Sequence, residues 1–389
     1  MSARSRPRKI SPSLPASFSF AFSFPFMFLS VVIPVFNAAP FLRECLESLR
    51  AQTFADWEAL CVDDGSTDAS AEILRAFAAK DPRFAVFSRE NAGYGAAVNF
   101  GLARARGEYV AILEPDDALA SPGAYAALAD AAARSRADVV KGDYNFYRGK
   151  TGRRERAFAL RGCPTGTPLG AEERGALFAL PLSVWSAFYR AGFLRERAIR
   201  FLETPGASFQ DNAFSVKVFA SAARVLLVDV PVVDYRQDNA ASSIKSPGKV
   251  FCVADEMHEA ERWLGENPAL RERFAYDFFL FKYKAYFANL LRIPRERRRE
   301  FFALFRGEFV EARESGALPE ALFRRLGKRL PLLLDAPEKF LRYARCRAAF
   351  DAFRRAKKNA LSVRRSREGW RVAFCGLHFR VPAPKGGAK

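Results

Sequence analysis

Apolar residues in the first third of the chain form short unbroken runs that alternate with longer amphipathic stretches. Residues 29–35, 57–62 and 109–113 are runs of the first kind, which are typical of strands buried on both faces. Residues 40–51 place their apolar side chains on one face of a helix. Strands that alternate with helices in this way predict βαβ units. We therefore expect an α/β fold with a mainly parallel central sheet and helices on both faces.

A polar cluster follows each predicted strand. Asn37 follows the first strand, Asp63 and Asp64 end the second, and a glycine-containing loop from Asn91 to Gly93 follows the third. Ligands bind at the carboxyl ends of parallel strands, so we expect these clusters to meet at one edge of the sheet and form a binding site.

The apolar run at residues 109–113 ends in Glu114-Pro115-Asp116-Asp117. Three carboxylates within four residues repel one another, and burying them costs free energy unless a cation compensates their charge. Such an oxygen-rich group suits a divalent metal ion, Mg²⁺ or Mn²⁺. The alternative is an acidic turn in which Asp117 caps the next helix. The other polar clusters at the same edge favour the metal site.

The sequence changes character after residue 245. Residues 251–353 have a helical composition, and basic clusters lie in or just after them at residues 295–299, 324–329 and 354–358. Residues 370–381 alternate enough to form a small terminal hairpin. The predicted parts are a disordered, basic and Phe-rich extension (residues 1–27), an α/β domain (28–245) and a helical, basic C-terminal region (246–389).

The net charge of +19 indicates a polyanionic partner: nucleic acid, an anionic membrane surface or a phosphate-bearing substrate.

The six scattered cysteines and two histidines have no metal-ligand spacing, which argues against a zinc site and favours a reducing compartment, the cytoplasm. No apolar run reaches the length of about 18 residues that predicts a membrane-spanning helix. The N-terminal stretch imitates a signal peptide but runs into the first strand. We therefore expect an uncleaved extension, or a true start at Met27.

Several motifs occur together in the order and spacing of a known family. A first block contains SVVIPVFNAAPFLRECLESLRAQTF, LCVDDGSTDAS and NAGYGAAVNFGLARARGEYVAILEPDD, and a later block contains VWSAFYRAGFLRERAIRF and GASFQDNAF. In these blocks the chain resembles a family 2 glycosyltransferase of the GT-A fold. The resemblance implies a Rossmann-like domain that moves a sugar, as a hexosyltransferase does, from a nucleotide-sugar to an acceptor hydroxyl, with inversion at the anomeric carbon.

The resemblance also implies substrates and a place of action. The favoured sugar donor is a UDP-sugar, and the acceptor is a saccharide or lipid-linked hydroxyl in the synthesis of cell-surface polysaccharide or lipopolysaccharide. The basic C-terminal region would hold the protein at the inner face of the cell membrane by contact with anionic lipid. No specific nucleic acid is expected as a partner.

At the strand ends the resemblance carries over to individual residues. Pro34 and Asn37 stand where the family wraps the nucleotide. Asp64, with Asp63 beside it, would accept a hydrogen bond from the base or ribose; alternatively it caps the turn at Gly65. The predicted residues that bind the nucleotide-sugar are Pro34, Asn37, Asp63, Asp64, Asn91, Gly93, Glu114, Asp117 and Trp185.

Glu114-Pro115-Asp116 stands in the place of the family's DxD motif, with Glu in place of the first Asp. Asp116 is the predicted metal ligand, through which the cation would neutralise the diphosphate leaving group. The glutamate keeps the charge of the first position but lengthens its reach. Asp117 would ligate the metal, touch the transferred sugar or cap the next helix.

Single displacement needs a base that takes the proton of the acceptor hydroxyl. In the family this carboxylate comes from a Glu-Asp pair that opens a helix, and here the pair is Gln210-Asp211. Asp211 is therefore the predicted catalytic base, and a helix cap without a chemical role is its alternative. Trp185 would stack on a sugar or belong to the core. Arg236 and Gln237 lie where the family closes a loop over the diphosphate.

The main alternative is a basic protein that binds nucleic acid or another polyanion on a nucleotide-binding scaffold. It explains the charge of +19 but not the clustered carboxylates, and a steep loss of DNA binding with salt would identify it. A non-catalytic relative that binds sugar nucleotides is disfavoured because Asp116 and Asp211 are both present. A nucleotidyltransferase would have a Gly-rich phosphate loop after the first strand, where this chain has PVFNA at residues 34–38.

Overall fold

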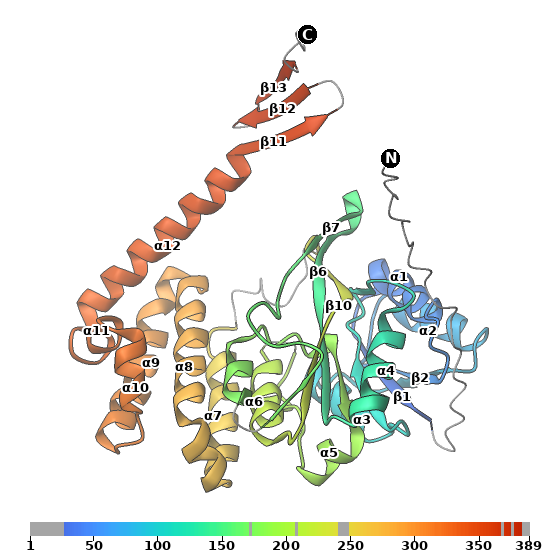
Figure 1. The fold of residues 1–389 in the computed structure, drawn as a ribbon, viewed down its shortest axis with the longest axis horizontal. Coiled ribbons are helices and arrows are strands. Elements are labelled where there is room, and N and C mark those ends of the chain that lie inside the picture. The colour runs from blue at the N-terminus through green and yellow to red at the C-terminus, as the bar shows by residue number, and fades with distance from the viewer. Residues whose placement is uncertain are drawn as a thin grey trace, which may run out of the picture.

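Among the described residues, ten strands form one central sheet (Figure 1). The computed structural model describes residues 27–170, 173–206, 209–239, 249–366, 369–374 and 377–382, with side chains up to residue 352. The strands are β1 (Leu29–Val35), β2 (Trp57–Asp63), β3 (Phe84–Ser88), β4 (Tyr109–Ile112), β5 (Ala118–Leu119), β6 (Val139–Arg148), β7 (Arg153–Arg156), β8 (Pro168–Leu169), β9 (Ala187–Arg190) and β10 (Val225–Arg236). They lie in the order β3-β2-β1-β4-β9-β6-β10-β5, with β7 paired to β6 and β8 to β10.

Most of the long strands run in the same direction. β1 pairs in parallel with β2 and β4, β2 with β3, and β6 with β10, whereas β9 lies antiparallel between β4 and β6. The predicted, mainly parallel sheet is therefore confirmed. The carboxyl ends of β1, β2, β3, β4, β6 and β10 consequently lie at one edge, and the polar clusters of the sequence follow these strands.

Helices cover both faces of the sheet. They are α1 (Ala39–Arg50), α2 (Ser70–Ala78), α3 (Tyr94–Leu102), α4 (Ala124–Ser135), α5 (Ala191–Glu196) and α6 (Asp211–Ser221). Successive residues of a strand point to opposite faces. Val31 and Ile33 accordingly pack with α1, α2 and α4 in one hydrophobic cluster, and Val32 belongs to a second cluster with α3, α5 and α6. The GT-A arrangement expected from the resemblance is present.

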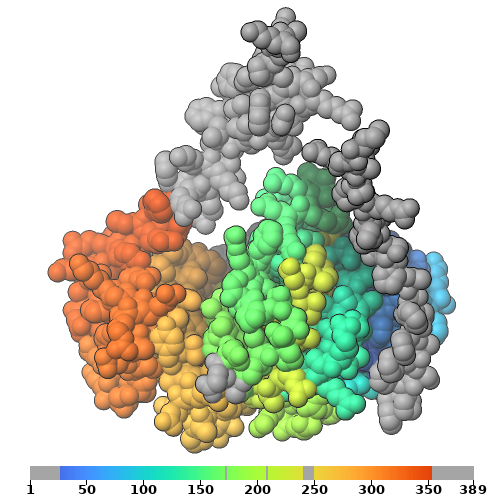
Figure 2. Space-filling view, in the orientation of Figure 1, coloured from blue at the N-terminus to red at the C-terminus, as the bar shows by residue number. Residues whose placement is uncertain are grey.

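Further helices follow residue 249 and extend the second cluster. They are α7 (Cys252–Gly265), α8 (Pro268–Arg292), α9 (Arg298–Glu314), α10 (Glu320–Leu326), α11 (Arg329–Asp335) and α12 (Pro337–Ala360). Phe178 stacks on Phe274 of α8, with ring centroids 5.6 Å apart, and both belong to the cluster that contains Val32. These helices form one side of the molecule, coloured gold to orange in Figure 2, and share a core with the sheet. None of the helices in the described part has the length and apolar character needed to cross a bilayer.

The region from residue 150 onward contains a short strand, β7, that the sequence analysis did not predict. β7 pairs with β6, and its Arg154 and Arg156 form ion pairs with Asp234 and Asp143. The strand is held by charge rather than by apolar burial, which explains why the hydrophobic pattern did not reveal it.

The two ends of the chain are described only in part. Residues 1–26 of the expected extension and the expected boundary near residue 246 lie outside the described residues. The carbonyl of Met27 accepts a hydrogen bond from the N–H of Glu108 at 2.9 Å, which ties it to the chain just before β4. The expected terminal hairpin is present within a three-stranded antiparallel sheet of β11 (Leu361–Ser366), β12 (Gly369–Phe374) and β13 (Leu377–Pro382).

Candidate active site

Side chains at the strand ends tie together the loops that follow β1 and β2. Asn37 has a φ of 50°, and its Oδ1 accepts hydrogen bonds from the backbone N–H groups of Thr67 (2.8 Å) and Asp68 (3.3 Å). Asp63 is buried and accepts a hydrogen bond from the N–H of Ser66 at 3.0 Å. Both side chains therefore fix the shape of this edge of the sheet.

Asp64 holds the loop that follows β3. Its buried carboxylate accepts hydrogen bonds from the N–H groups of Ala92 (3.2 Å) and Gly93 (2.8 Å), and it pairs with Arg89 at 3.3 Å. Asn91 adds a hydrogen bond from its Nδ2 to the carbonyl of Asp64 at 3.0 Å. Asp64 and Asn91 are thus brought together as the sequence predicted, with much of their hydrogen-bonding capacity used inside the protein.

Gly93 and Pro34 shape the same edge through the backbone. Gly93 has a φ of 94°, and a Cβ atom there would lie 2.5 Å from the carbonyl oxygen of Thr204. The position therefore requires glycine. The next N–H, at the start of α3, donates to the carbonyl of Gly206 at 2.9 Å, so α3 begins against the loop that leads to α6. Pro34 lies near the carboxyl end of β1, in register with Val62 of β2.

The acidic turn after β4 carries three carboxylates in three different environments. Glu114 accepts a hydrogen bond from the hydroxyl of Tyr94 at 2.6 Å, and Asp116 accepts one from Nδ2 of Asn239 at 2.8 Å. Asp117 is buried, and its Oδ1 accepts the last backbone N–H of β10 at 2.8 Å. Its Oδ2 is buried and, among the described residues, has no hydrogen-bond partner.

Burial disfavours the charged forms of two carboxylates of this turn, Glu114 and Asp117. Burial raises the pKa of Glu114 to about 8; the hydrogen bond from Tyr94 opposes the shift, and the charges of Asp116 and Asp211 add to it. Burial, followed by the charge of Asp116, also raises the pKa of Asp117 well above its usual range. Such a turn would be stabilised by positive charge placed beside it.

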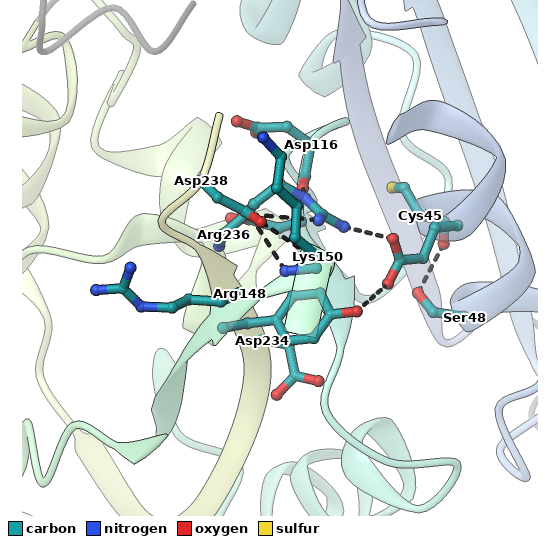
Figure 3. Close-up of polar contacts among 12 residues, drawn as sticks. Cys45, Ser48, Asp116, Arg148, Lys150, Asp234, Arg236 and Asp238 are labelled. Carbon is teal, nitrogen blue, oxygen red and sulfur yellow. Dashed lines mark hydrogen bonds and ion pairs between the residues drawn. The ribbon is translucent and has the colours of Figure 1, made fainter. Parts of the chain in front are cut away.

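Arg236, the last residue of β10, joins the acidic turn to α1 (Figure 3). Its Nε donates to the carbonyl of Asp116 at 2.7 Å, and its guanidinium pairs with Glu44 and lies 3.6 Å from Asp238. The hydroxyl of Tyr147 donates to Glu44 at 2.8 Å. The guanidinium that the sequence placed near the diphosphate is therefore used within the protein, where it positions the turn.

Asp211 is the first residue of α6, as the sequence predicted. Burial raises its pKa to about 6, while backbone hydrogen bonds at Asp211 and Asn212 and the charge of Lys141 lower it. Its neighbour Gln210 is buried and donates from Nε2 to the hydroxyl of Thr204 at 3.0 Å. Gln210 thus braces the preceding loop and leaves Asp211 as the carboxylate of the pair.

Lys141 of β6 is a site residue that the sequence analysis missed. It is buried, and its ammonium donates to the carbonyls of Leu182 (3.1 Å) and Ser183 (2.8 Å) and to the hydroxyls of Ser183 (2.7 Å) and Ser186 (2.9 Å). Burial lowers its pKa to about 7, against the charges of Asp143 and Asp211. A lone lysine directly after Val139-Val140, inside a predicted strand, is the sequence signal that could have revealed it.

The turn held by this lysine, η3 (Val184–Ser186), presents Trp185. The half-buried indole stacks on Tyr235, with centroids 5.0 Å apart, and meets the edge of Tyr144 at 4.9 Å. Burial raises the pKa of the Tyr235 hydroxyl. Four negative charges add to this effect, those of Asp117, Asp116, Glu114 and Asp211. Hydrogen bonds link the acidic turn to the start of α6. The hydroxyl of Tyr94 donates to Glu114, and the carbonyl of Gly206 accepts both the N–H of Tyr94 at 2.9 Å and Nε2 of Gln210 at 3.2 Å.

Glu256 of α7 is a second residue that the sequence did not indicate. It is buried, and its Oε2 accepts a hydrogen bond from the N–H of Ala213, in the first turn of α6, at 3.1 Å. Its Oε1 has no hydrogen-bond partner among the described residues. Burial raises the pKa of Glu256 to about 8, and the charge of Asp211 contributes after the opposing hydrogen bond from Ala213. The helical region thus reaches the helix start that carries Asp211.

The carboxylates of the acidic turn fit a hard cation that takes few ligands from the protein. In the described part of the chain, no group of three or more His, Cys, Asp or Glu residues is preassembled around a metal position. The half-exposed carboxylate of Asp116 and Oδ2 of Asp117, which has no partner among the described residues, are nevertheless oxygen donors in one turn. Mg²⁺ and Mn²⁺ are commonly held by one or two carboxylates together with substrate phosphates.

Comparison with known proteins agrees with this arrangement. The family model "Glycosyl transferase family 2" matches residues 30–204. EpsH of Bacillus subtilis (strain 168) is 30% identical over 249 residues, which cover 63% of this chain and 71% of EpsH. EpsJ of the same organism is 29% identical over 230 residues, 54% of this chain but only 61% of EpsJ. A crystal structure of S. aureus TarS 1–349 shares the fold, with a TM-score of 0.59 and 20% identity over 90% of this chain and 97% of that one. The chain belongs to glycosyltransferase family 2.

Proposed function

We propose that this protein transfers a sugar from a nucleotide-sugar, a UDP-sugar, to an acceptor hydroxyl with inversion at the anomeric carbon. The observation that carries the proposal is the link through Tyr94, which donates from its hydroxyl to Glu114 of the acidic turn and from its N–H to the carbonyl of Gly206, in the loop that Gln210 joins to Asp211. TarS, which has the same fold, has been crystallised in complex with UDP-GlcNAc and with UDP, which supports the choice of donor class.

Asp211 is the proposed general base. As the acceptor oxygen forms a bond to the anomeric carbon, Asp211 takes the hydroxyl proton, and the bond between that carbon and the diphosphate oxygen breaks. A pKa of about 6 suits the task, because the carboxylate is ionised at neutral pH and is more basic than an exposed aspartate. The proton ends on Asp211, and the nucleoside diphosphate leaves with the bonding electrons.

Asp116 and Asp117 are the proposed holders of a divalent cation. The cation would supply positive charge to the departing diphosphate. Asp116 offers a half-exposed carboxylate, and Asp117 offers a buried oxygen that has no other partner among the described residues. Glu114 is bound by Tyr94, so we assign it to shaping the turn rather than to the metal.

The remaining predicted residues would surround the nucleotide-sugar. Asn37, Asp63, Asp64, Asn91 and Gly93 hold the loops after β1, β2 and β3, and we propose that these loops, with Pro34, form the nucleotide pocket. The half-buried Trp185 would stack against a sugar. Direct contact of Asp64 with the base stays a prediction.

We further propose that the acceptor is a saccharide or lipid-linked hydroxyl of a cell-surface polysaccharide or lipopolysaccharide. The protein would act in the cytoplasm, at the inner face of the membrane, through its basic helical region. The net charge of +19 and the basic clusters of that region support this place of action.

Thermal unfolding with UDP, GDP and CMP tests the proposal without a known acceptor. A ligand that binds only the native state raises its apparent stability. We expect an increase with UDP that grows with Mn²⁺, and we expect Asp116→Ala to lose the Mn²⁺-dependent part. Asp130→Asn, on the exposed face of α4, is the control and should respond like the wild type. Equal behaviour of all nucleotides, with or without Mn²⁺, would contradict the proposal.

A further inference from the structure

A groove of about 490 Å³ lies between α8, the start of α9 and the first half of α12, away from the acidic turn. Its lining includes the apolar side chains of Leu290, Leu341 and Ala344. Leu341, Ala344 and Ala348 are spaced three and four residues apart on α12, which places them on one face of that helix. The groove therefore has an apolar strip along one helix, near the end of a second.

The rim of the groove carries exposed arginines. Arg295, Arg299 and Arg345 are exposed, and no acidic side chain of the described residues lies within ion-pairing distance of them. Adjacent arginines are paired: Arg297 with Glu300 at 2.6 Å, and Arg347 with Asp351 at 2.9 Å. Three exposed arginines without an acidic partner among the described residues therefore line a groove whose lining contains a single acidic residue, Glu338.

The apolar strip and the rim of arginines together indicate which kind of ligand fits the groove. A free phosphate would use the arginines but not the apolar strip. A nucleic acid would use the charges along a surface, without a need for leucines and alanines in a recess. An amphiphile with an anionic head and a hydrocarbon tail uses both parts. The side chain of Phe350, one residue beyond the groove-lining Ala349, is 53% exposed, which extends the apolar character toward solvent.

We propose that this groove binds an anionic phospholipid, with the phosphate among Arg295, Arg299 and Arg345 and the start of an acyl chain along the apolar strip. The inference rests on the membrane contact in the proposed function and gives that contact a specific site. Binding here would anchor the helical region, which shares a core with the sheet, and so hold the active site near the membrane surface.

Sedimentation of the full chain with vesicles tests the site. We expect binding to vesicles that contain phosphatidylglycerol in phosphatidylcholine, and little binding to phosphatidylcholine alone. Replacing Arg295, Arg299 and Arg345 by Gln should weaken binding on the order of 100-fold, because each basic residue near an anionic surface contributes roughly fivefold and the three factors multiply. The matched control replaces three other exposed arginines, Arg161→Gln, Arg195→Gln and Arg271→Gln, with the same loss of charge, and should bind nearly as the wild type does.

A second variant separates the groove from the charge. Ala348→Trp keeps every arginine but fills the apolar strip, and we expect it to weaken binding of soluble, short-chain phosphatidylglycerol at least tenfold, on the scale of a lost buried chain segment. Equal losses in the two triple variants, no effect of Ala348→Trp, or equally tight binding of glycerol phosphate or RNA would each overturn the site. The UDP-dependent rise in thermal stability should persist in all variants. Its absence from the wild type would contradict the proposed function, not the lipid site.

Discussion

The loops after β1, β2 and β3 and the acidic turn after β4 follow parallel strands to the same edge of the sheet, yet their carboxylates differ in how completely they are hydrogen-bonded. In the loops, Asp63 and Asp64 accept hydrogen bonds from backbone N–H groups of neighbouring residues. In the turn, Asp117 has a buried oxygen without a partner among the described residues. Burial raises the pKa of Glu114 to about 8 and that of Asp211, at the start of α6, to about 6.

This difference separates residues that build the site from residues that act in it. A carboxylate that accepts several N–H groups stabilises the fold, so its loss should first reduce stability. A buried carboxylate oxygen without a partner opposes folding, and groups of this kind cluster where a ligand or a proton is to be bound. Variants in the two regions should therefore fail in different assays.

The largest effect is expected for Asp211→Asn. An amide cannot accept the proton of the acceptor hydroxyl, and loss of a general base reduces turnover by about 10²- to 10⁴-fold. The increase in thermal stability with UDP should remain, because the substitution leaves the acidic turn intact. Near-normal transfer by Asp211→Asn, in an assay where the exposed control Asp130→Asn is fully active, would exclude Asp211 as the base.

The pH dependence of the wild-type enzyme provides the same test without a substitution. Burial raises the pKa of Asp211 to about 6, so the base is protonated, and inactive, below that pH. Activity should therefore rise with pH through about 6, over a pH range higher than an exposed aspartate would give. A rate that stays level down to the usual range of an exposed aspartate would contradict the assignment.

Asp117→Asn should weaken binding and leave the fold intact. We expect UDP with Mn²⁺ to bind about 10- to 100-fold less tightly, the range found when groups at a metal site are changed. The free energy of unfolding should stay equal or increase, since burying a neutral amide costs less than burying a charge. Titration calorimetry and chemical denaturation measure the two quantities. A large loss of stability would place Asp117 with the loop-building residues instead.

The residues that the sequence located best lie in short motifs at the ends of elements. Asp116 follows a buried strand and Asp211 begins a helix, so local pattern and family resemblance suffice to place both. The sequence could not show which of these carboxylates have hydrogen-bond partners for all of their oxygens inside the protein and which do not. That division depends on partners such as Asn239 for Asp116, 123 residues away along the chain.

Lys141 and Glu256 were missed for the same physical reason. The acceptors of Lys141 lie about 40 residues further along the chain, and Glu256 meets α6 across 43 residues. Neither contact produces a periodic pattern of apolar and polar residues in the sequence. The strand β7 was missed because its arginines are held by ion pairs with distant acids, which a hydrophobic pattern does not record. The groove beside α12 depends on three helices and has no local motif at all.

A smaller effect, on stability alone, is expected for Asp64→Asn. The amide group replaces one acceptor by a donor, so an N–H of Ala92 or Gly93 loses its partner inside the protein. The free energy of unfolding should fall by about 1–3 kcal/mol, the usual penalty for an unsatisfied buried group. Chemical denaturation measures the loss, and the exposed Asp130→Asn should show far less. If stability were unchanged while UDP binding disappeared, Asp64 would be a nucleotide contact and not a loop-building residue.

The smallest effect is expected for Glu256→Gln. The sign of its change in stability distinguishes a carboxylate whose pKa burial raises from one whose pKa neighbouring cations lower. Burial raises the pKa of Glu256 from 4.5 to about 8, so its contribution to stability is present below the usual carboxylate range and is lost as the pH rises through about 8. Glutamine keeps an oxygen for the N–H of Ala213 but cannot ionise, so the variant should gain stability relative to the wild type as the pH rises.

Glu259, one turn further along α7, is the matched control. Although burial raises its pKa, hydrogen bonds from Arg262 and Lys217 lower it overall, so Glu259→Gln should lose stability at neutral pH. Denaturation at pH about 5 and about 9 measures both variants. Parallel behaviour of the two would mean that Glu256 is an ordinary paired carboxylate and that the helical region does not add charge to the start of α6.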